Sequence, residues 1–175
     1  MNTFVVEKWY DEGECCSFYT VRWADNSHSE TDRFFLNHEK ATQPYSNEAY
    51  ELLHLITQCI GNTYGATDDF FDRTENQAQA LPPMPKRSVP EILRLGKRFP
   101  LRLYCFRISE SIVVLFNGGI KSHQTSQGSK DLRLKFYEAQ QFALQIIEAI
   151  KNGTIVVNNF KREITDFQGN KQIIL

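Results

Sequence analysis

The chain has 175 residues, of which 41% are hydrophobic, 13% aromatic and 23% charged, and its formal net charge is −1. This composition predicts a globular protein of one domain and excludes a largely disordered chain, a collagen-like repeat and a coiled coil. No apolar run approaches the ~20 residues that a membrane-spanning helix needs, and Met1–Tyr10 lacks the cationic start of a secretion signal, so we expect a cytoplasmic protein without membrane contact.

The segments before residue 81 are predicted to form strands first and helices later. Strands, which β-branched and aromatic residues indicate, are expected at 3–9, 17–24 and 33–36. A turn at 11–14 joins the first two strands and suggests an N-terminal hairpin. Helices are expected at 47–60, where apolar residues recur at helical spacing between Ser46 and Gly61, and within 68–80.

The segments after the proline-rich stretch 81–85 are predicted to form a second hairpin and a long helix. Strands are expected at 100–108, 111–117, 154–157 and 172–175, and the first two are close enough in sequence to pair as a hairpin. Helices are expected at 90–95 and 132–151, and the longer one has the clearest apolar face in the chain. The dipeptide Gly118-Gly119 is expected to break or bulge its strand, and 126–131 is predicted to be a polar loop.

Together these elements predict an α+β fold with a twisted, mostly antiparallel sheet and flanking helices. The stretch 81–85 is predicted to separate an acidic subdomain at 1–80 from a basic subdomain at 86–175. The alternative is that both parts form one compact domain. The length also allows a homodimer.

The charges are distributed unevenly along the chain. Residues 1–79 hold 5 basic and 14 acidic residues, a balance of −9, whereas residues 80–175 hold 15 basic and 7 acidic residues, a balance of +8. Clustered cations favour a polyanionic partner such as RNA, because binding releases the counterions of the nucleic acid. The alternative is that the acidic half folds against the basic segment and neutralises it, and the two interpretations are compatible.

The four cysteines do not form a recognisable framework. Cys15 and Cys16 are adjacent, Cys59 and Cys105 lie far from them, and no spacing fits a zinc ribbon or a redox pair. We therefore expect free thiols in a reducing compartment. The chain also lacks a phosphate-binding loop and the helical zinc-protease motif, so the sequence predicts neither a metal site nor a cofactor.

The segment 96–124, GKRFPLRLYCFRISESIVVLFNGGIKSHQ, holds the candidate catalytic residues Arg102, Lys121 and His123. Arg102 is suited to hold a phosphate, Lys121 to neutralise charge that builds on phosphorus, and His123 to move a proton to or from a ribose hydroxyl or a leaving oxygen. Such phosphodiester chemistry needs no metal. Arg107 is an odd number of residues from Arg102, so the two side chains are expected on opposite faces of the strand.

Seven further cations are expected to contact RNA: Lys86, Arg87, Lys97, Arg98, Arg107, Lys130 and Arg133. A plainer interpretation is that all these side chains are merely solvated cations on a cytosolic hairpin.

The sequence LRLYCFRISESIVVLFNGGIKSHQ, followed by a polar loop and the helix KFYEAQQFALQII, resembles the HigB branch of the RelE-like toxins of bacterial toxin–antitoxin modules. The resemblance covers about residues 90–150, so residues 1–80 form an extension of hairpin and helices. It implies a small α/β domain, metal-independent cleavage of mRNA on the ribosome, and restraint by an antitoxin protein. Arg102 and Lys121 match the family's strand arginine and first lysine after the second strand, whereas the role of His123 is inferred from its chemistry.

Three functions follow as hypotheses. The first is a toxin-like endoribonuclease or an inactive relative, with RNA or the ribosome and an antitoxin as partners. The second is a non-catalytic protein–protein interaction module of a bacterial regulatory or defence system. The third is a small-molecule enzyme that uses Cys105 or His54 in a pocket.

Overall fold

The computed structural model describes residues 2–75, 77–121 and 126–175. Its strands are β1 (Phe4–Tyr10), β2 (Ser17–Trp23), β3 (Thr74–Glu75), β4 (Ala78–Leu81), β5 (Leu101–Ser109), β6 (Ile112–Ile120), β7 (Ile155–Asn158), β8 (Glu163–Asp166) and β9 (Ile173–Ile174). Its helices are α1 (Glu30–His38), α2 (Ser46–His54), the π-helix η1 (Leu55–Tyr64), the 3₁₀-helix η2 (Asp68–Phe70), α3 (Pro90–Leu95) and α4 (Ser126–Lys151).

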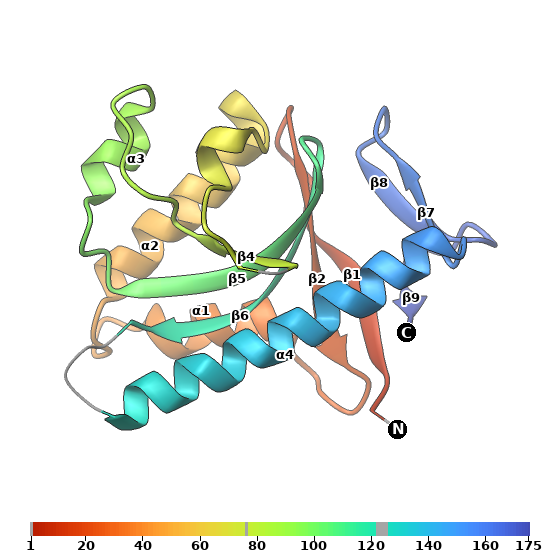
Figure 1. Ribbon diagram of the computed structural model, residues 1–175, viewed down its shortest axis with the longest axis horizontal. Coiled ribbons are helices and arrows are strands. Elements are labelled where there is room, and N and C mark those ends of the chain that lie inside the picture. Colours follow the sequence, from red (N-terminus) through yellow and green to blue (C-terminus); the bar gives the residue numbers. More distant parts are fainter. Residues whose placement is uncertain (1, 76, 122–125) are drawn as a thin grey trace.

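Seven strands form one sheet in the order β3-β4-β5-β6-β2-β1-β9, and β7 and β8 form a small second sheet (Figure 1). All neighbours in the large sheet are antiparallel except β2 and β6, which run parallel where Ser17–Thr20 pairs with Ile112–Leu115. This architecture confirms the predicted α+β class. Strands from both sides of the stretch 81–85 contribute to the same sheet.

The two predicted hairpins are confirmed. β1 pairs with β2 and β5 pairs with β6, each in antiparallel register. The register of β5 and β6 shifts by one residue between the pairs Leu103–Gly118 and Cys105–Leu115, which is a β-bulge. The two residues in the bulge are Phe116 and Asn117, which lie opposite Tyr104. The prediction that Gly118-Gly119 breaks or bulges the strand is therefore wrong, because both glycines pair regularly with Leu103 and Arg102 and β6 continues to Ile120.

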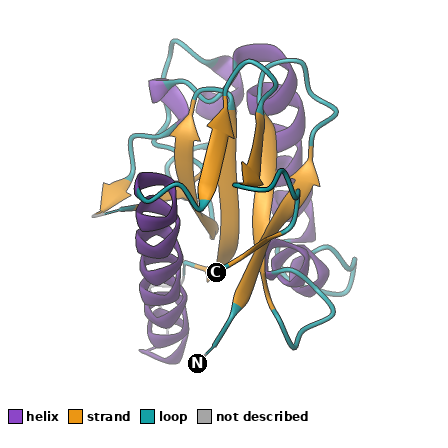
Figure 2. Cartoon of the chain, turned by 90° about the vertical axis from the view of Figure 1, so that its right-hand side faces the viewer, coloured by secondary structure: helices purple, strands orange, loops and turns teal. Residues whose placement is uncertain are grey.

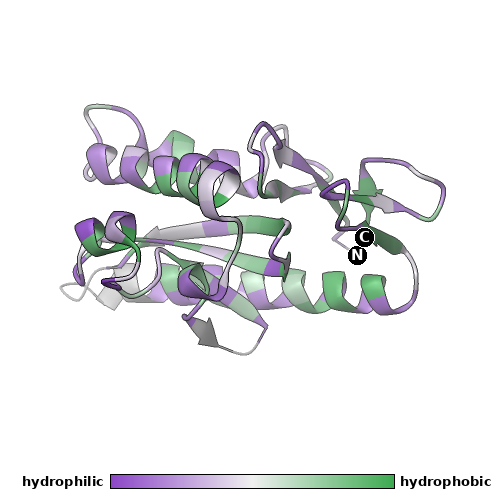
Figure 3. Cartoon of the chain, turned by 90° about the horizontal axis from the view of Figure 1, so that it is seen from above, coloured by the Kyte–Doolittle hydropathy of each residue, from purple (hydrophilic) through white to green (hydrophobic). Residues whose placement is uncertain are grey.

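Two apolar clusters lie on opposite faces of the sheet. One contains Phe34 from α1, Leu52 from α2, Ile60 from η1 and Ile92 from α3. The other contains residues of α4 such as Phe142, together with the inner residues of the small β7–β8 sheet. The result is three layers, with the long helix α4 and the small β7–β8 sheet packed on one side of the large sheet and the shorter helices on the other (Figure 3).

The two ends of the chain lie side by side at one edge of the sheet (Figure 2). Phe4 and Leu175 exchange two backbone hydrogen bonds, with N···O distances of 3.0 and 2.9 Å. The final strand thus closes the sheet beside β1, and the predicted C-terminal strand is confirmed as the short β9.

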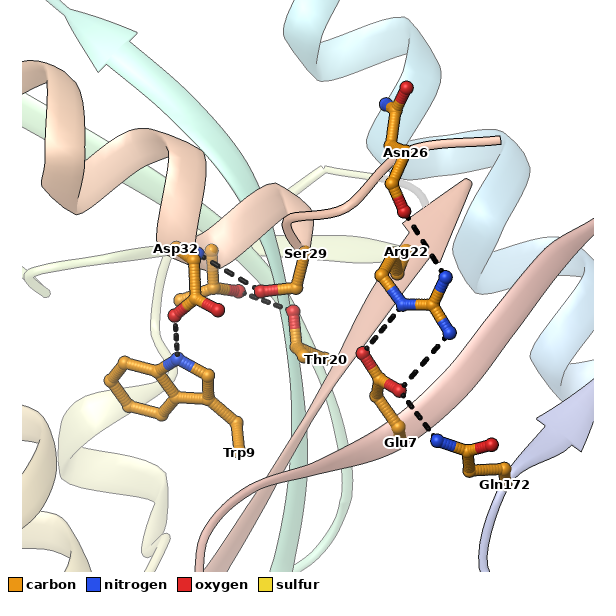
Figure 4. A network of polar contacts seen from close by, with 9 residues as sticks. Glu7, Trp9, Thr20, Arg22, Asn26, Ser29, Asp32 and Gln172 are labelled. Carbon is orange, nitrogen blue, oxygen red and sulfur yellow. Dashed lines mark hydrogen bonds and ion pairs between the residues drawn. The ribbon is translucent and has the colours of Figure 1, made fainter. Parts of the chain in front are cut away.

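The strand predicted at 33–36 is wrong, because these residues lie inside α1. Ser29 caps this helix by accepting a hydrogen bond from the backbone N–H of Asp32 at 3.1 Å, and Asp32 in turn accepts one from the indole of Trp9 (Figure 4). The adjacent aromatic residues Phe34 and Phe35 favoured a strand in the sequence, but both are buried as part of the helix. The capping serine was the signal that favoured a helix.

Two other predictions are also corrected. The segment 68–80 forms a single 3₁₀ turn and then strands β3 and β4, since Ala78–Leu81 completes the ladder beside β5. The predicted loop at 126–131 is the start of α4. The helix predicted at 47–60 exists as α2, but it continues as the π-helix η1 to Tyr64, so Gly61 does not end it.

Candidate functional site

A cationic pocket lies at the end of the sheet where α3 leads into β5 and where β6 ends. Its lining residues are Lys97, Arg98, Phe99 and Lys121, and its volume is about 360 Å³. Lys97 and Arg98 are exposed, whereas Lys121 is half-buried. Three positive side chains from two separate segments therefore surround one small hollow, which we call the cationic pocket.

Local sequence explains why the two segments meet. Pro90 occupies the first turn of α3, and Gly96 ends that helix with a φ of +80°, a conformation that favours glycine. Phe99 then anchors the chain by inserting its ring into the core. The carbonyl of Pro100 accepts a hydrogen bond from the backbone N–H of Lys121 at 2.6 Å, which holds the turn against the end of β6.

Arg102 lies beside this pocket as a buried guanidinium, with only 4% of its surface exposed. Its Nη1 donates hydrogen bonds to the carbonyls of Phe99 and Leu101, at 3.0 and 2.9 Å. Its buried Nη2 has no hydrogen-bond partner among the residues described. Burial, and then the charge of Arg73, lower the pKa of Arg102 to about 10, so the cation is held without a compensating carboxylate.

Gly118 allows this arrangement because β5 and β6 approach closely there. An added Cβ at Gly118 would lie 2.8 Å from the carbonyl carbon of Arg102 and 2.9 Å from Cα of Leu103, with the Arg102 oxygen closer still. Gly119, its neighbour, would meet only the side chain of Leu132 at 3.6 Å. The first glycine is thus required for backbone approach, and the second is not.

Lys121 is coupled electrostatically to the buried Arg102 and to the half-buried Arg73. Burial lowers the pKa of Lys121, and the charges of Arg102 and Arg73 lower it further. Five cations in or beside the pocket form no ion pair with a described residue: Arg73, Lys97, Arg98, Arg102 and Lys121. An arrangement of like charges without counter-charges favours an anionic ligand.

Arg73 is the member that sequence analysis missed. It is the only basic residue between Lys40 and Lys86, in the acidic half of the chain, so the charge pattern pointed elsewhere. Its Nε donates a hydrogen bond to the carbonyl of Pro82 at 2.9 Å. The available signal in the sequence was a single cation within an acidic segment. In the fold, Arg73 is hydrogen-bonded to Ala80 of β4, and the pairing of β4 with β5 brings it near Arg102.

The predicted residues are therefore brought together in part. Arg102 and Lys121 are near one another with Lys97 and Arg98, whereas His123 lies outside the described residues. Lys130 and Arg133 are exposed near the start of α4, which begins at the same end of the sheet (Figure 1).

The other predicted cations are used differently. Lys86, in the loop before α3, pairs with Asp72, which lies just before β3, and Arg87 is exposed in the same loop as Lys86. Arg107 lies at the opposite end of β5 from Arg102, where it pairs with Asp68 at 2.8 Å and stacks over the ring of Phe71. Its contacts lie on the face opposite Arg102, as the odd spacing predicted.

A second polar cluster fills the place where β2 and β6 diverge. The buried carboxylate of Glu30 accepts a hydrogen bond from the side-chain amide of Asn117 at 2.7 Å and one from Arg33 at 2.9 Å. Glu138 of α4 faces this carboxylate. Burial, and then the neighbouring charge of Glu30, raise the pKa of Glu138, and its buried Oε1 has no partner among described residues.

A larger pocket of about 910 Å³ lies between α3 and the α2–η1 segment, and His54 and Cys59 line it. Burial raises the pKa of the thiols of Cys59 and Cys105, which disfavours the thiolate that nucleophilic chemistry needs. All four cysteines are free thiols. This pocket therefore offers no activated nucleophile among the cysteines.

Within the described ranges, no three His, Cys, Asp or Glu side chains gather as metal ligands would. No described helix combines the length and apolar character needed to cross a bilayer. Comparisons with protein-family models, with curated proteins and with solved structures find no match to this chain.

Proposed function

We propose that the protein binds RNA at the cationic pocket and acts on mRNA as a toxin-like, metal-independent endoribonuclease. The observation that carries this proposal is the convergence of Lys97, Arg98 and Lys121 on one pocket, beside a buried arginine and without described ion pairs. The resemblance of residues 90–150 to RelE-like toxins supports the same function.

In the proposed reaction, the ribose 2′-oxygen attacks the adjacent phosphorus and the bond from phosphorus to the 5′-oxygen breaks. The 2′-hydroxyl loses its proton and the leaving 5′-oxygen gains one, which yields a 2′,3′-cyclic phosphate and a 5′-hydroxyl end. Lys121 stabilises the additional negative charge that develops on the phosphoryl oxygens. His123 is the residue to which we assign proton transfer.

Arg102 has a positioning role in this proposal. Its guanidinium is buried and donates to the carbonyl of Phe99, so it braces the turn that carries Lys97 and Arg98. Its charge also adds to the positive potential that Lys121 and the bound phosphate experience.

The proposal is tested by measuring RNA affinity against salt concentration. Counterion release makes the logarithm of affinity for a single strand fall with log salt by about 0.7 per phosphate contact. The Lys121→Gln variant should bind more weakly and have a slope smaller by about 0.7. Lys151→Gln, an exposed lysine at the far end of α4, is the matched control and should behave as wild type. RNA affinity that is independent of salt, or equal in both variants, would contradict the proposal.

A second candidate function is a non-catalytic interaction module. It is favoured by two exposed aromatic side chains near the β7–β8 sheet, Phe160 at 97% and Phe167 at 72% exposure. An antitoxin or another protein is the expected partner on this alternative. It predicts that Phe160→Ser abolishes the biological effect of the protein and that Lys121→Gln leaves it unchanged.

A further inference from the structure

The charge of the cationic pocket exceeds what one internal phosphate of RNA neutralises. Lys97, Arg98 and Lys121 line the pocket, and Arg102 and Arg73 act on it electrostatically from beside it. A phosphodiester carries one negative charge, whereas a phosphate monoester carries about −1.5 to −2 at pH 7. No described carboxylate pairs with any of these cations, so a bound anion would meet their charge without competition from an internal ion pair.

The donors of the pocket also fit a terminal phosphate. Arg98 presents a planar guanidinium that can hold two phosphoryl oxygens, and the two lysines supply compact ammonium groups. A terminal phosphate has three free oxygens to accept such donors, one more than an internal diester offers. The volume of about 360 Å³ lies at the small end of the range for ligand pockets, about 300–1,000 Å³, and suits one nucleotide-sized group.

The buried arginine makes the positive charge a permanent property of the site. Arg102 is fixed by two backbone carbonyls, at 3.0 and 2.9 Å, and Gly118 fixes the strand beside it, so this cation cannot swing into solvent. An anion that enters the pocket offsets the repulsion among Arg102, Arg73 and Lys121.

We propose that the cationic pocket binds a phosphate monoester, the terminal phosphate of an RNA strand, more tightly than an internal phosphodiester. The inference rests on the proposed function, because RNA is the source of the phosphate. The inference deepens that function because a pocket that favours a doubly charged phosphate also favours the transition state of cleavage, in which the phosphoryl group carries two negative charges. The 3′-phosphate end and the 5′-phosphate end share this chemistry, and the experiment separates them.

The experiment measures the affinity of the full chain for one RNA decamer in three forms: with a 3′-phosphate, with a 5′-phosphate and with hydroxyls at both ends. The ribose 2′-positions are methylated to prevent cleavage. We expect the decamer with one phosphorylated end to bind about tenfold more tightly than the hydroxyl form at pH 7.5, and the identity of that end shows the polarity of the bound strand. The preference should shrink at pH 5, because the second phosphate pKa is about 6.

Two variants connect the preference to the pocket. Lys121→Gln and Arg98→Gln should each lose it, whereas Lys151→Gln should retain it, and circular dichroism shows whether each variant is folded. Equal affinity for all three decamers would overturn the inference and leave RNA binding, and hence the proposed function, standing. If adenosine monophosphate binds at the pocket but no decamer does, the pocket is a phosphate-monoester site that does not bind RNA. The proposed function then fails.

Discussion

Replacing Gly118 with alanine is expected to destabilise the protein strongly, because the new methyl group would meet the backbone of β5. Its carbon would lie 2.8 Å from the carbonyl carbon of Arg102 and 2.9 Å from Cα of Leu103, closer than non-bonded carbons normally approach. These atoms belong to a central strand of the sheet and cannot move away as a flexible side chain can.

The magnitude follows from two contributions. Overpacking in a well-packed interior costs about 1–3 kcal/mol. Separating β5 from β6 at this point also weakens about two ladder hydrogen bonds, each worth about 1 kcal/mol. We therefore expect Gly118→Ala to lower the free energy of unfolding by about 3–5 kcal/mol and the melting temperature by about 6–20 °C.

Gly119→Ala is the matched control, since its methyl group would meet only Leu132 Cδ1 at an ordinary contact distance of 3.6 Å. Urea unfolding followed by circular dichroism measures both variants in parallel, and the control should lie within about 0.5 kcal/mol of wild type. If Gly118→Ala were as stable as Gly119→Ala, the close approach of β5 and β6 that positions Arg102 would be refuted.

Two further predictions concern α4. The pKa of Glu138 is raised in the folded protein, so the free energy of unfolding should fall as pH rises above the ordinary carboxyl pKa of 4.5. Glu138→Gln should remove this pH dependence and raise the free energy of unfolding at pH 7 by about 1 kcal/mol, as measured by urea unfolding. A variant less stable than wild type at pH 7 would contradict this. Gln140→Leu should lower the free energy of unfolding by about 2–3 kcal/mol, because Gln140 Oε1 accepts hydrogen bonds from the backbone N–H groups of Gln77 and Ala78 at 3.0 and 2.8 Å. The control Gln141→Leu changes an exposed residue and should leave stability unchanged. Equal stability of the two variants in urea unfolding would show that these hydrogen bonds contribute nothing.

Elements of the fold were predictable where the spacing of apolar residues in the sequence matches the face that the element buries in the structure. The hairpin of β5 and β6 was clear because its β-branched and aromatic runs flank a short turn, and both strands are central in the sheet. The C-terminal part of α4 was clear because one face packs against the sheet. The start of α4 was missed, since its first residues are polar and carry no apolar period.

The sheet order could not be read from local pattern. β2 and β6 are separated by about half of the chain and run parallel, so no local sequence pattern joins them. The π-helix η1 was likewise hidden, because its sequence continues the helical spacing of α2.

Of the candidate site, the sequence predicted only that positively charged residues gather around the β5–β6 hairpin. Arg102 and Lys121 were found by their position around the hairpin, but the sequence did not show that Arg102 is buried and braced by the carbonyl of Phe99. Arg73 was missed because it reaches the site through the pairing of β4 with β5. Burial and long-range pairing are properties of the whole fold, and no short segment encodes them.

The most direct test of the proposed activity is cleavage of an mRNA by the purified chain in the presence of a metal chelator. Wild type and Lys151→Gln should cut the transcript and leave 2′,3′-cyclic phosphate ends, whereas Lys121→Gln should be slower by about two orders of magnitude, as expected when a group that stabilises the transition-state charge is removed. An intact transcript with wild-type protein, or equal cleavage by all three proteins, would contradict a ribonuclease that works at the cationic pocket.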